Sequence, residues 1–197
     1  QFEVNPKLEH SRTGISLLKN TKFDLVIAVG GGSVIDTAKT INILATQKNS
    51  DLVKYVNDNT LITERGLPLV AIPTTAGTGS EATHFSVVYV DKIKHSLAHR
   101  FMLPNYVIID AELSYSLPPH ITAASGMDAL SQAVESYWSV KSTKESKKLA
   151  SEAIILILKA LKSAVSGNKI SIITMSKAAN LAGKAINITE TTAPHAI

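Results

Sequence analysis

Short runs of Val, Ile and aromatic residues recur along the first half of the chain, each bounded by glycine, proline or polar residues. Runs of this length and composition are typical of buried β-strands. Where helical stretches separate such runs, the pattern predicts a parallel sheet with helices packed on it. We expect the strands at residues 24–30, 69–72, 85–90 and 106–110.

A helical pattern lies between the first two of these strands. Residues 33–46 carry apolar side chains at positions 34, 35, 38, 41 and 44, which share one face of a helix that can pack on the sheet. A shorter helical approach is expected at residues 11–19. Residues 91–94 lie between two short strand-like runs, residues 87–90 and 96–98, and predict the turn of a hairpin.

The pattern changes after Asp110. Pro118 and Pro119 interrupt the chain, because proline ends both helices and strands. The residues beyond them have helical periodicity and few strand formers. We therefore predict an α/β domain with a parallel sheet over residues 1–117, followed by an all-helical domain over residues 118–197.

The helical part of the chain is predicted to hold three helices. Tyr137 and Trp138, at the end of the first helix, are expected to be core residues rather than cofactor contacts. Gly167 and Asn168 separate the second helix from the third, as expected of residues that end and begin helices. The helices are expected at residues 121–138, 144–165 and 171–188.

Three consecutive glycines, residues 30–32, follow the first strand and lead directly into the first long helix. Without Cβ atoms, the backbone N–H groups can approach an anion closely, and the positive end of the helix dipole favours one there. Ser33 is expected to cap this helix, and Asp36 and Lys39 stand one turn apart and can pair. The turn predicts a diphosphate-bearing cofactor, with a glycine turn that serves only packing as the alternative.

This turn differs from two common nucleotide motifs. A G-x-G-x-x-G fingerprint would need glycine where Ile35 stands, and the G-K-[ST] ending of a P-loop is absent. A second loop, over residues 73–81, also follows a buried-type strand. Its hydroxyl groups offer short hydrogen-bond donors, and its glycines let the chain bend towards a ligand.

Three motifs occur in a fixed order: GGGSVIDTAK at residues 30–39, IPTTAGTGSE at residues 72–81, and GMDAL at residues 126–130 followed by Glu135. They resemble the iron-containing (group III) alcohol dehydrogenase family, within the dehydroquinate synthase-like superfamily. The resemblance implies a dinucleotide-binding domain followed by a helical metal-binding domain. It also implies further residues of both domains beyond the two ends of this sequence, and a homo-oligomer such as a dimer.

The resemblance further implies interconversion of an alcohol and an aldehyde or ketone, with NAD or NADP as the cofactor. Alternatives are a dehydroquinate synthase, a glycerol dehydrogenase, a glycerol-phosphate dehydrogenase, or a nucleotide-binding regulator without catalysis. A purely structural protein would need neither glycine-rich loop. The residues assigned to the cofactor are Gly30, Gly31, Gly32, Ser33, Asp36, Thr74, Thr75, Thr78, Ser80 and Lys94.

A metal site is implied in the helical domain. Members of the family present Asp-Ala-Leu-x-His, which places two ligands one helical turn apart. This chain has Asp128 but Gln132 at the second position, and His195 matches a further ligand. These three residues are the candidates both for catalysis and for binding Fe²⁺ or Zn²⁺. An amide is a weaker ligand than imidazole, so a metal-free reductase in which Gln132 donates to the substrate remains the alternative.

The substrate is expected to be a small anionic aldehyde, with phosphonoacetaldehyde as an example. The residues from Lys184 to Thr189, and then Thr191 to His195, resemble the branch of the family that reduces such phosphonates. A lysine and two hydroxyls, Thr191 and Thr192, could hold the anion while the carbonyl faces the nicotinamide.

Composition argues against disulfide-bonded, membrane and nucleic-acid-binding classes of protein. The chain has no cysteine, which removes disulfides and thiolate metal sites and suits a reducing cytoplasm. Its most apolar stretch, residues 153–158, is far too short to span a bilayer. The net charge of +4 is dispersed and lacks the aromatic interleaving of nucleic-acid sites. We therefore expect neither membrane insertion nor nucleic-acid binding.

Overall fold

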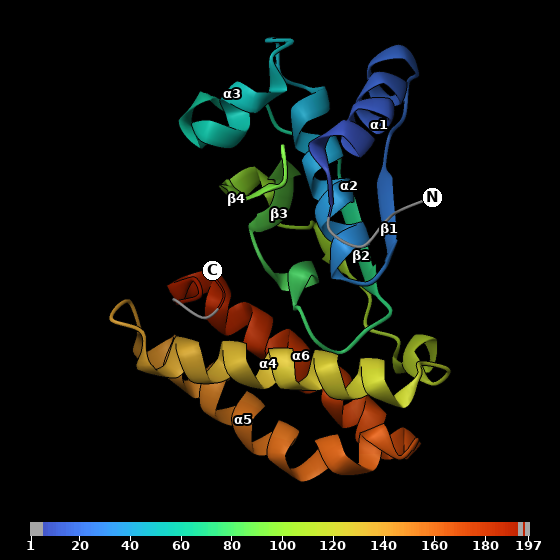
Figure 1. Cartoon of the computed structure of the whole chain (residues 1–197), viewed down its shortest axis with the longest axis vertical. Helices are drawn as coiled ribbons and strands as arrows, with labels where there is room; N and C mark the ends of the chain where they lie inside the picture. The colour runs from blue at the N-terminus through green and yellow to red at the C-terminus, as the bar shows by residue number, and fades with distance from the viewer. Residues whose placement is uncertain (1–5, 193–194, 196–197) are drawn as a thin grey trace. The chain divides into compact units, whose positions relative to one another are not determined.

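The structure is a computed structural model that describes residues 6–192 and 195, and it divides into two compact units (Figure 1). The first unit takes in the residues up to Ile72 together with His84–Ile108. The second takes in Pro73–Thr83 and the residues from Ile109 onwards. The expected domain division at residues 117 and 118 stays a prediction about the complete protein.

The first unit is built on a three-stranded sheet in the order β1 (Val26–Gly30), β2 (Leu69–Pro73), β5 (Tyr106–Val107). Strands β2 and β5 run parallel, with Val70 opposite Tyr106. Helix α2 (Gly32–Ala45) packs on the sheet. The small core between them consists of Ala28, Leu69 and Ala71 with Ile35 of α2, and Val26 and Ala38 pack against it.

The strand expected at residues 106–110 is shorter than predicted. Ile108 still donates its N–H to the carbonyl of Ala71 over 3.0 Å, but beyond it the chain leaves the sheet. The reason is local, because Asp110 accepts a hydrogen bond from the N–H of Glu112 and begins the 3₁₀ turn η4 (Ala111–Ser114). The apolar pattern assigns residues up to Asp110 to the strand, whereas in the structure Asp110 is the N-cap of η4.

A second layer of the first unit contains α1 (Leu8–Asn20), α3 (Leu52–Asn57) and the hairpin of β3 (Phe85–Val90) and β4 (Ile93–Ala98). The hairpin turn is only Asp91 and Lys92, both with positive φ, as a two-residue turn of type I′ requires. The turn predicted over residues 91–94 is therefore too long, and Lys94 lies on β4. The remaining 3₁₀ turns are η1 (Asn59–Leu61), η2 (Ser80–Ala82) and η3 (Arg100–Met102).

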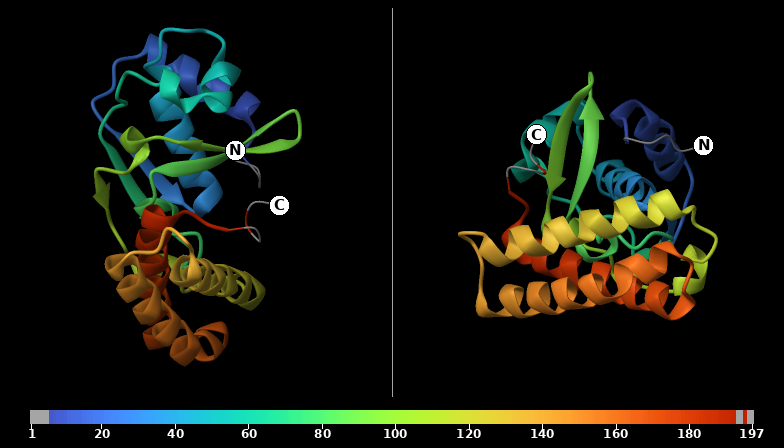
Figure 2. Two further views of the ribbon diagram at one scale, coloured as in Figure 1. Left: turned by 90° about the vertical axis from the view of Figure 1, so that its left-hand side faces the viewer. Right: turned by 60° about the horizontal axis from the view of Figure 1, so that its bottom comes forward.

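Three long helices form the second unit: α4 (Pro119–Trp138), α5 (Lys144–Val165) and α6 (Lys169–Thr189) (Figure 2). They confirm the predicted helices to within two residues at each end. Thr143 and Ser146 form a capping box at the start of α5, and Asn168 caps α6. Their shared core is rich in alanine, whose small side chain lets helices approach closely: Ala129, Ala133, Ala153, Ala160, Ala178 and Ala182.

The prediction that Tyr137 and Trp138 are core residues is wrong. Their exposed fractions are 47% and 65%. The buried stripe of α4 runs through Ala129, Ala133 and Ser136, so the two aromatic residues of the last turn lie on its outer side.

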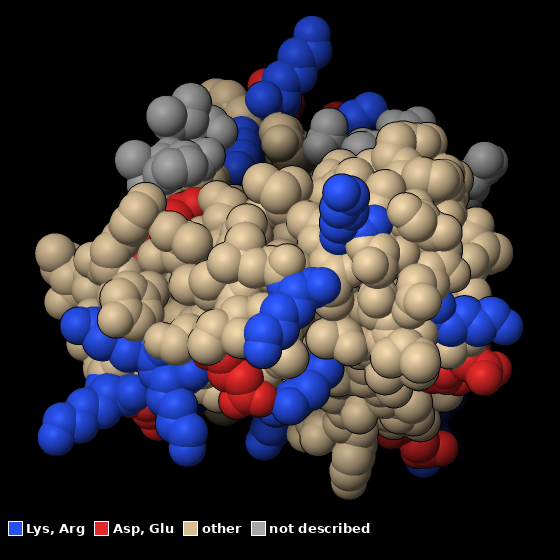
Figure 3. Space-filling model, turned by 90° about the horizontal axis from the view of Figure 1, so that it is seen from below, with Lys and Arg blue, Asp and Glu red and all other residues tan. Residues whose placement is uncertain are grey.

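Uncharged surface covers much of the face shown in Figure 3, which is the side on which α5 lies in Figure 1. Lys and Arg side chains are scattered over this face rather than gathered in one track. Exposed apolar residues of α5 and α6 include Ile155, Leu158, Ile170 and Ile173. In the described part of the chain, no helix is both long and apolar enough to cross a membrane.

Candidate functional site

The glycine turn joins β1 to α2 in the first unit. Gly31 is the N-cap of α2, with an extended conformation and no side-chain cap, and Gly32 is the first helical residue. Ser33 therefore lies inside the first turn, and the prediction that it caps the helix is wrong. The physical reason is that Gly31 leaves the strand and turns into the helix two residues earlier than expected. The first N–H groups of a helix have no acceptor within it, which leaves them available to an anion.

Gly30 has a packing role. A Cβ atom at this position would lie 2.7 Å from Cβ of Val34 on the following turn. Real Cβ atoms do not approach a neighbour so closely, so the strand can end this near to α2 only with glycine. The alternative interpretation of the glycines, as packing residues, therefore holds for Gly30, whose contact with a cofactor stays a prediction.

Helix α2 is fastened to the hairpin by polar groups below its first turn. The Asp36 carboxylate accepts a hydrogen bond from the N–H of Val87 over 2.9 Å. The buried Lys39 side chain donates to the carbonyl of Phe85, also over 2.9 Å. These contacts fix the helix whose N-terminus forms the glycine turn. Lys94, by contrast, is exposed on β4, and its contact with the cofactor stays a prediction.

The threonine-rich loop belongs to the second unit. Thr74 and Thr75 are half-buried, Thr78 is exposed and Ser80 is buried. The Thr78 hydroxyl accepts a hydrogen bond from the N–H of Ser80 over 3.3 Å, and the carbonyl of Thr74 accepts one from Ser114 over 3.0 Å. The cofactor contacts assigned to these four residues stay predictions.

The two glycines of this loop allow it to lie close to the helices. A Cβ at Gly79, where φ is +60°, would lie 2.5 Å from Cα of Gly183 on α6. A Cβ at Gly77 would lie 2.6 Å from Cβ of Ser125 on α4. Both positions therefore require glycine for packing within the unit, whether or not a ligand is present.

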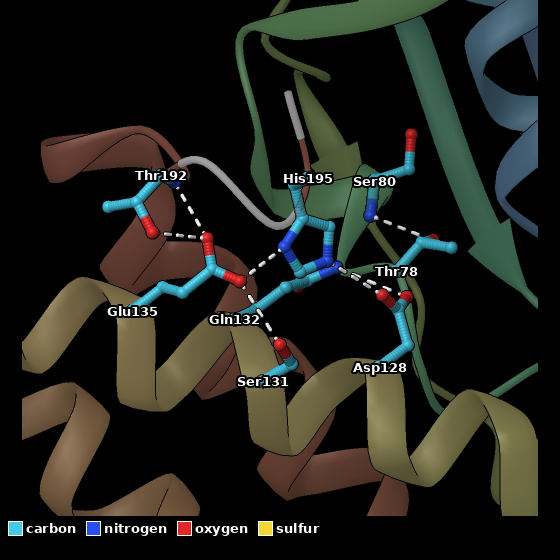
Figure 4. A network of polar contacts seen from close by, with 8 residues as sticks. All are labelled: Thr78, Ser80, Asp128, Ser131, Gln132, Glu135, Thr192 and His195. Atoms are coloured by element: carbon cyan, nitrogen blue, oxygen red, sulfur yellow. Dashed lines mark hydrogen bonds and ion pairs between the residues drawn. The ribbon is translucent and has the colours of Figure 1, made fainter. Parts of the chain in front are cut away.

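A cluster of polar side chains lies on α4 and on the chain after α6 (Figure 4). Gln132 donates its amide N–H to one oxygen of Asp128 over 3.1 Å, since the two residues are one turn apart. Nε2 of His195 lies 3.0 Å from the other oxygen of Asp128. The structure thus brings together the three residues predicted to carry catalysis and metal binding.

Glu135 joins this cluster and was not among the predicted site residues. Its side chain is 1% exposed, and its Oε1 lies 2.5 Å from Nδ1 of His195. The signal that could have found it is the spacing of 128, 132 and 135, which places all three residues on one face of a helix. What the spacing could not indicate is that His195 returns to that face.

The charges in the cluster shift two pKa values in opposite directions. The hydrogen bond with Asp128 raises the pKa of His195; burial opposes this, and Glu135 adds to the rise. Burial works to raise the pKa of Glu135, but hydrogen bonds from Thr192 and His195 outweigh it and hold that pKa below its ordinary value. A charged carboxylate therefore sits against a ring that is readily protonated in the absence of a competing cation.

The donor set fits a divalent cation. A carboxylate, an imidazole nitrogen and an amide oxygen are ligands that iron and zinc accept. Oε1 of Gln132 is buried, and within the described residues it has no hydrogen-bond partner. An unsatisfied buried acceptor costs about 1–3 kcal/mol, which a cation would relieve. The described residues hold no group of three or more His, Cys, Asp or Glu arranged for a metal, so Gln132 would have to contribute.

The residues predicted to bind an anionic substrate differ in exposure and in hydrogen bonding. Lys184 is exposed on α6, and Thr191 is half-buried. The Thr192 hydroxyl donates to Glu135 over 2.7 Å and is thus already engaged.

Comparison with known proteins covers both parts of the chain. Residues 1–111 match the family described as iron-containing alcohol dehydrogenase, and residues 122–197 match the C-terminal part described as Fe-containing alcohol dehydrogenase family. Long-chain-alcohol dehydrogenase 1 of Geobacillus thermodenitrificans is 42% identical over 91% of this chain and 46% of its own length.

Solved structures give the same picture. The iron-containing alcohol dehydrogenase of Thermotoga maritima is similar with a TM-score of 0.94 at 38% identity, over 100% of this chain and 54% of its own. Sulfoacetaldehyde reductase from Bifidobacterium kashiwanohense, solved in complex with NAD⁺, has a TM-score of 0.93 at 34% identity, over 99% of this chain and 53% of its own. The chain therefore spans about half the length of these relatives.

Proposed function

Because the chain belongs to the iron-containing alcohol dehydrogenase family, we propose that the complete protein is an NAD(P)-dependent oxidoreductase that interconverts an alcohol and an aldehyde or ketone. The observation that carries the proposal is the cluster of Asp128, Gln132 and His195. Its oxygen and nitrogen atoms are suited to bind a divalent cation, which would polarise the substrate carbonyl. The names of the relatives, which are alcohol dehydrogenases and an aldehyde reductase, support the same reaction class.

The glycine turn is proposed to hold the cofactor diphosphate. The N–H groups of Gly32 and Ser33, at the start of α2, would donate to it, and the helix dipole would favour its charge. The NAD⁺ complex of the sulfoacetaldehyde reductase supports a nicotinamide cofactor for this family. When bound, that cofactor supplies or accepts the hydride.

Asp128, Gln132 and His195 are proposed to hold a divalent cation, Fe²⁺ or Zn²⁺, which as a Lewis acid stabilises the developing alkoxide. The carboxylate supplies the negative charge, and Gln132 and His195 supply neutral donors. In a metal-free enzyme, Gln132 would instead donate its amide N–H to the substrate oxygen. The first assignment accounts for Oε1 of Gln132, which has no hydrogen-bond partner among the described residues, and the second does not.

A small anionic aldehyde, such as a phosphonate or sulfonate, is the proposed substrate. The similarity to a sulfoacetaldehyde reductase supports an anionic group. Lys184 and Thr191 are the residues available to bind it, since the Thr192 hydroxyl already donates to Glu135. A dimeric assembly and a cytoplasmic location remain predictions.

The test uses the full-length protein with NADH and, separately, NADPH. Absorbance of the reduced cofactor is followed with phosphonoacetaldehyde, sulfoacetaldehyde and neutral aldehydes of the same length. We expect oxidation of the cofactor, faster with the anionic aldehydes. Equal rates with neutral aldehydes, or no effect of Lys184→Ala on kcat/KM, would overturn the anionic substrate. Tight cofactor binding without turnover would favour the alternative that the protein is a nucleotide-binding regulator without catalytic activity.

A further inference from the structure

Glu135 makes more contacts than its position in a helix requires. It accepts hydrogen bonds from the N–H and the hydroxyl of Thr192, both over 2.7 Å, and from the hydroxyl of Ser131 over 3.0 Å. Its fourth partner is Nδ1 of His195. Burying a carboxylate is costly unless its acceptor sites are filled, and here all the partners come from two short segments.

The ring of His195 is oriented by this contact. An ionised carboxylate only accepts hydrogen bonds, so Nδ1 must be the donor and must carry a proton. The other nitrogen, Nε2, faces Asp128 over 3.0 Å and donates to it while the ring is protonated. In the neutral ring the proton stays on Nδ1, because the contact with Glu135 is shorter and Glu135 is the more deeply buried carboxylate. When one ring nitrogen donates to a carboxylate, the other is the one presented to a metal or a substrate.

We propose that Glu135 is a positioning residue that fixes His195 as the Nδ1–H form and aims its Nε2 at the Asp128 and Gln132 donors. The proposal rests on the proposed function, because it assigns Glu135 a role in that same site. Glu135 acts in two ways. It binds the ring directly. It also accepts hydrogen bonds from the N–H and the hydroxyl of Thr192, which precedes His195 by three residues.

Glu135→Gln is the sharpest variant, because it keeps the size of the side chain. The backbone N–H of Thr192 requires an acceptor, so it holds the amide oxygen and leaves the amide NH2 facing Nδ1. Nδ1 would then accept a hydrogen bond, lose its proton and leave Nε2 as the N–H of a neutral ring. A ring nitrogen that carries a proton cannot bind a metal. A carboxylate that accepts a hydrogen bond from a metal-ligating histidine is typically worth 10–100-fold in metal affinity, so we expect zinc affinity to fall by about that factor.

The experiment uses the full-length protein labelled with ¹⁵N-histidine, with His195→Gln to assign the signal. Zinc dissociation constants come from competition with a chelator, and ¹⁵N chemical shifts of the neutral ring report the protonated nitrogen. We expect Nδ1–H in the wild type and Nε2–H in Glu135→Gln. We also expect kcat to fall while the dissociation constant of NADH is unchanged.

Two further variants separate positioning from folding. Ser131→Ala removes one donor to Glu135 without touching the ring, and we expect it to keep the Nδ1–H form and bind zinc within about threefold of the wild type. Glu135→Asp shortens the side chain but keeps a pure acceptor, so it should retain the Nδ1–H form with weaker zinc binding. If Glu135→Gln does not fold, the zinc affinity of Glu135→Asp decides, and an affinity equal to that of the wild type would overturn the positioning role.

The outcomes also separate this inference from the proposed function. Unchanged zinc affinity and an Nδ1–H ring in Glu135→Gln would overturn the role of Glu135 even if the wild type reduces aldehydes. An enzyme that reduces no aldehyde, yet shows the expected exchange of tautomers, would overturn the function and leave the positioning role standing.

Discussion

The glycine turn of the first unit and the polar cluster of the second are built in opposite ways. The turn is made of backbone from four consecutive residues, 30–33, and its chemistry depends on the absence of side-chain atoms. The cluster is made of side chains, and its most distant partners, Asp128 and His195, are 67 residues apart. The turn is therefore sensitive to added side-chain volume, and the cluster is sensitive to a change in the type of donor.

The largest effect is expected from changing a donor in the cluster. Asp128→Asn preserves shape but removes the charge that both His195 and Gln132 contact. Loss of one group that stabilises charge in a transition state costs on the order of 10²–10³-fold in kcat, and we expect a loss in that range. Steady-state kinetics of the full-length protein measure it, with NADH affinity as the second readout.

Glu190→Gln is the matched control, because it alters an exposed carboxylate of the same unit, which pairs with Lys141. It should leave kcat within about twofold, as expected of an exposed ion pair. Asp128→Asn with full activity would remove the cluster from the chemistry.

The next effect concerns added volume in the turn. Gly32→Val places a branched side chain at the first helical residue, where the diphosphate is proposed to lie. We expect NADH affinity to fall more than tenfold, which corresponds to about 1.4 kcal/mol. Fluorescence titration with NADH measures it, and circular dichroism should show an intact fold. Unchanged affinity would place the cofactor elsewhere.

Gly30→Ala sharpens the contrast within the turn itself. Its Cβ would lie 2.7 Å from that of Val34, so the effect is on packing rather than on the cofactor. Overpacking of this kind costs about 1–3 kcal/mol in the free energy of unfolding. Denaturant titration measures it. Val34→Ala in the same chain keeps Cβ but removes the two Cγ atoms, which would lie 2.7 and 2.9 Å from the new Cβ, so it should restore part of the loss. A variant that is stable but binds no NADH would show that Gly30 contacts the cofactor after all.

The elements of the fold were predictable where the signal is contiguous. The helices of the second unit follow from uninterrupted periodicity, and the glycine turn from adjacent residues. The prediction that Ser33 caps α2 is wrong, because the position of the N-cap depends on where β1 ends, and three consecutive glycines do not indicate that position. The strand at 106–110 was cut short by the cap at Asp110, a competing local signal.

The candidate site was predictable only in part. Asp128, Gln132 and His195 came from motif resemblance, and the structure brings them together. Glu135 stood on the same helical face, but its function depends on partners 57 and 60 residues away. Periodicity carries no information about contacts of that range, so the sequence pattern could not assign it a role.

The smallest effect is expected at an exposed ion pair. A hydrogen bond from Lys177, and then its charge, lower the pKa of Glu152 from the ordinary value of 4.5. A carboxylate whose pKa is lowered in the folded state stabilises the fold at a pH above its ordinary pKa. This contribution is lost as the pH falls through the lowered pKa of the folded state. Glu152→Gln should therefore lower Tm slightly at neutral pH and not at all in strong acid. An equal difference at both pH values would contradict this.

The reaction proposed for the complete protein is hydride transfer between a nicotinamide and a carbonyl carbon. Full-length protein is incubated with an aldehyde and NADH that carries deuterium at C4 on one face, then on the other, and the alcohol is examined by mass spectrometry. We expect one deuterium on the carbinol carbon from one of the two labelled cofactors. Alcohol formed without deuterium from either, or no alcohol at all, would contradict it.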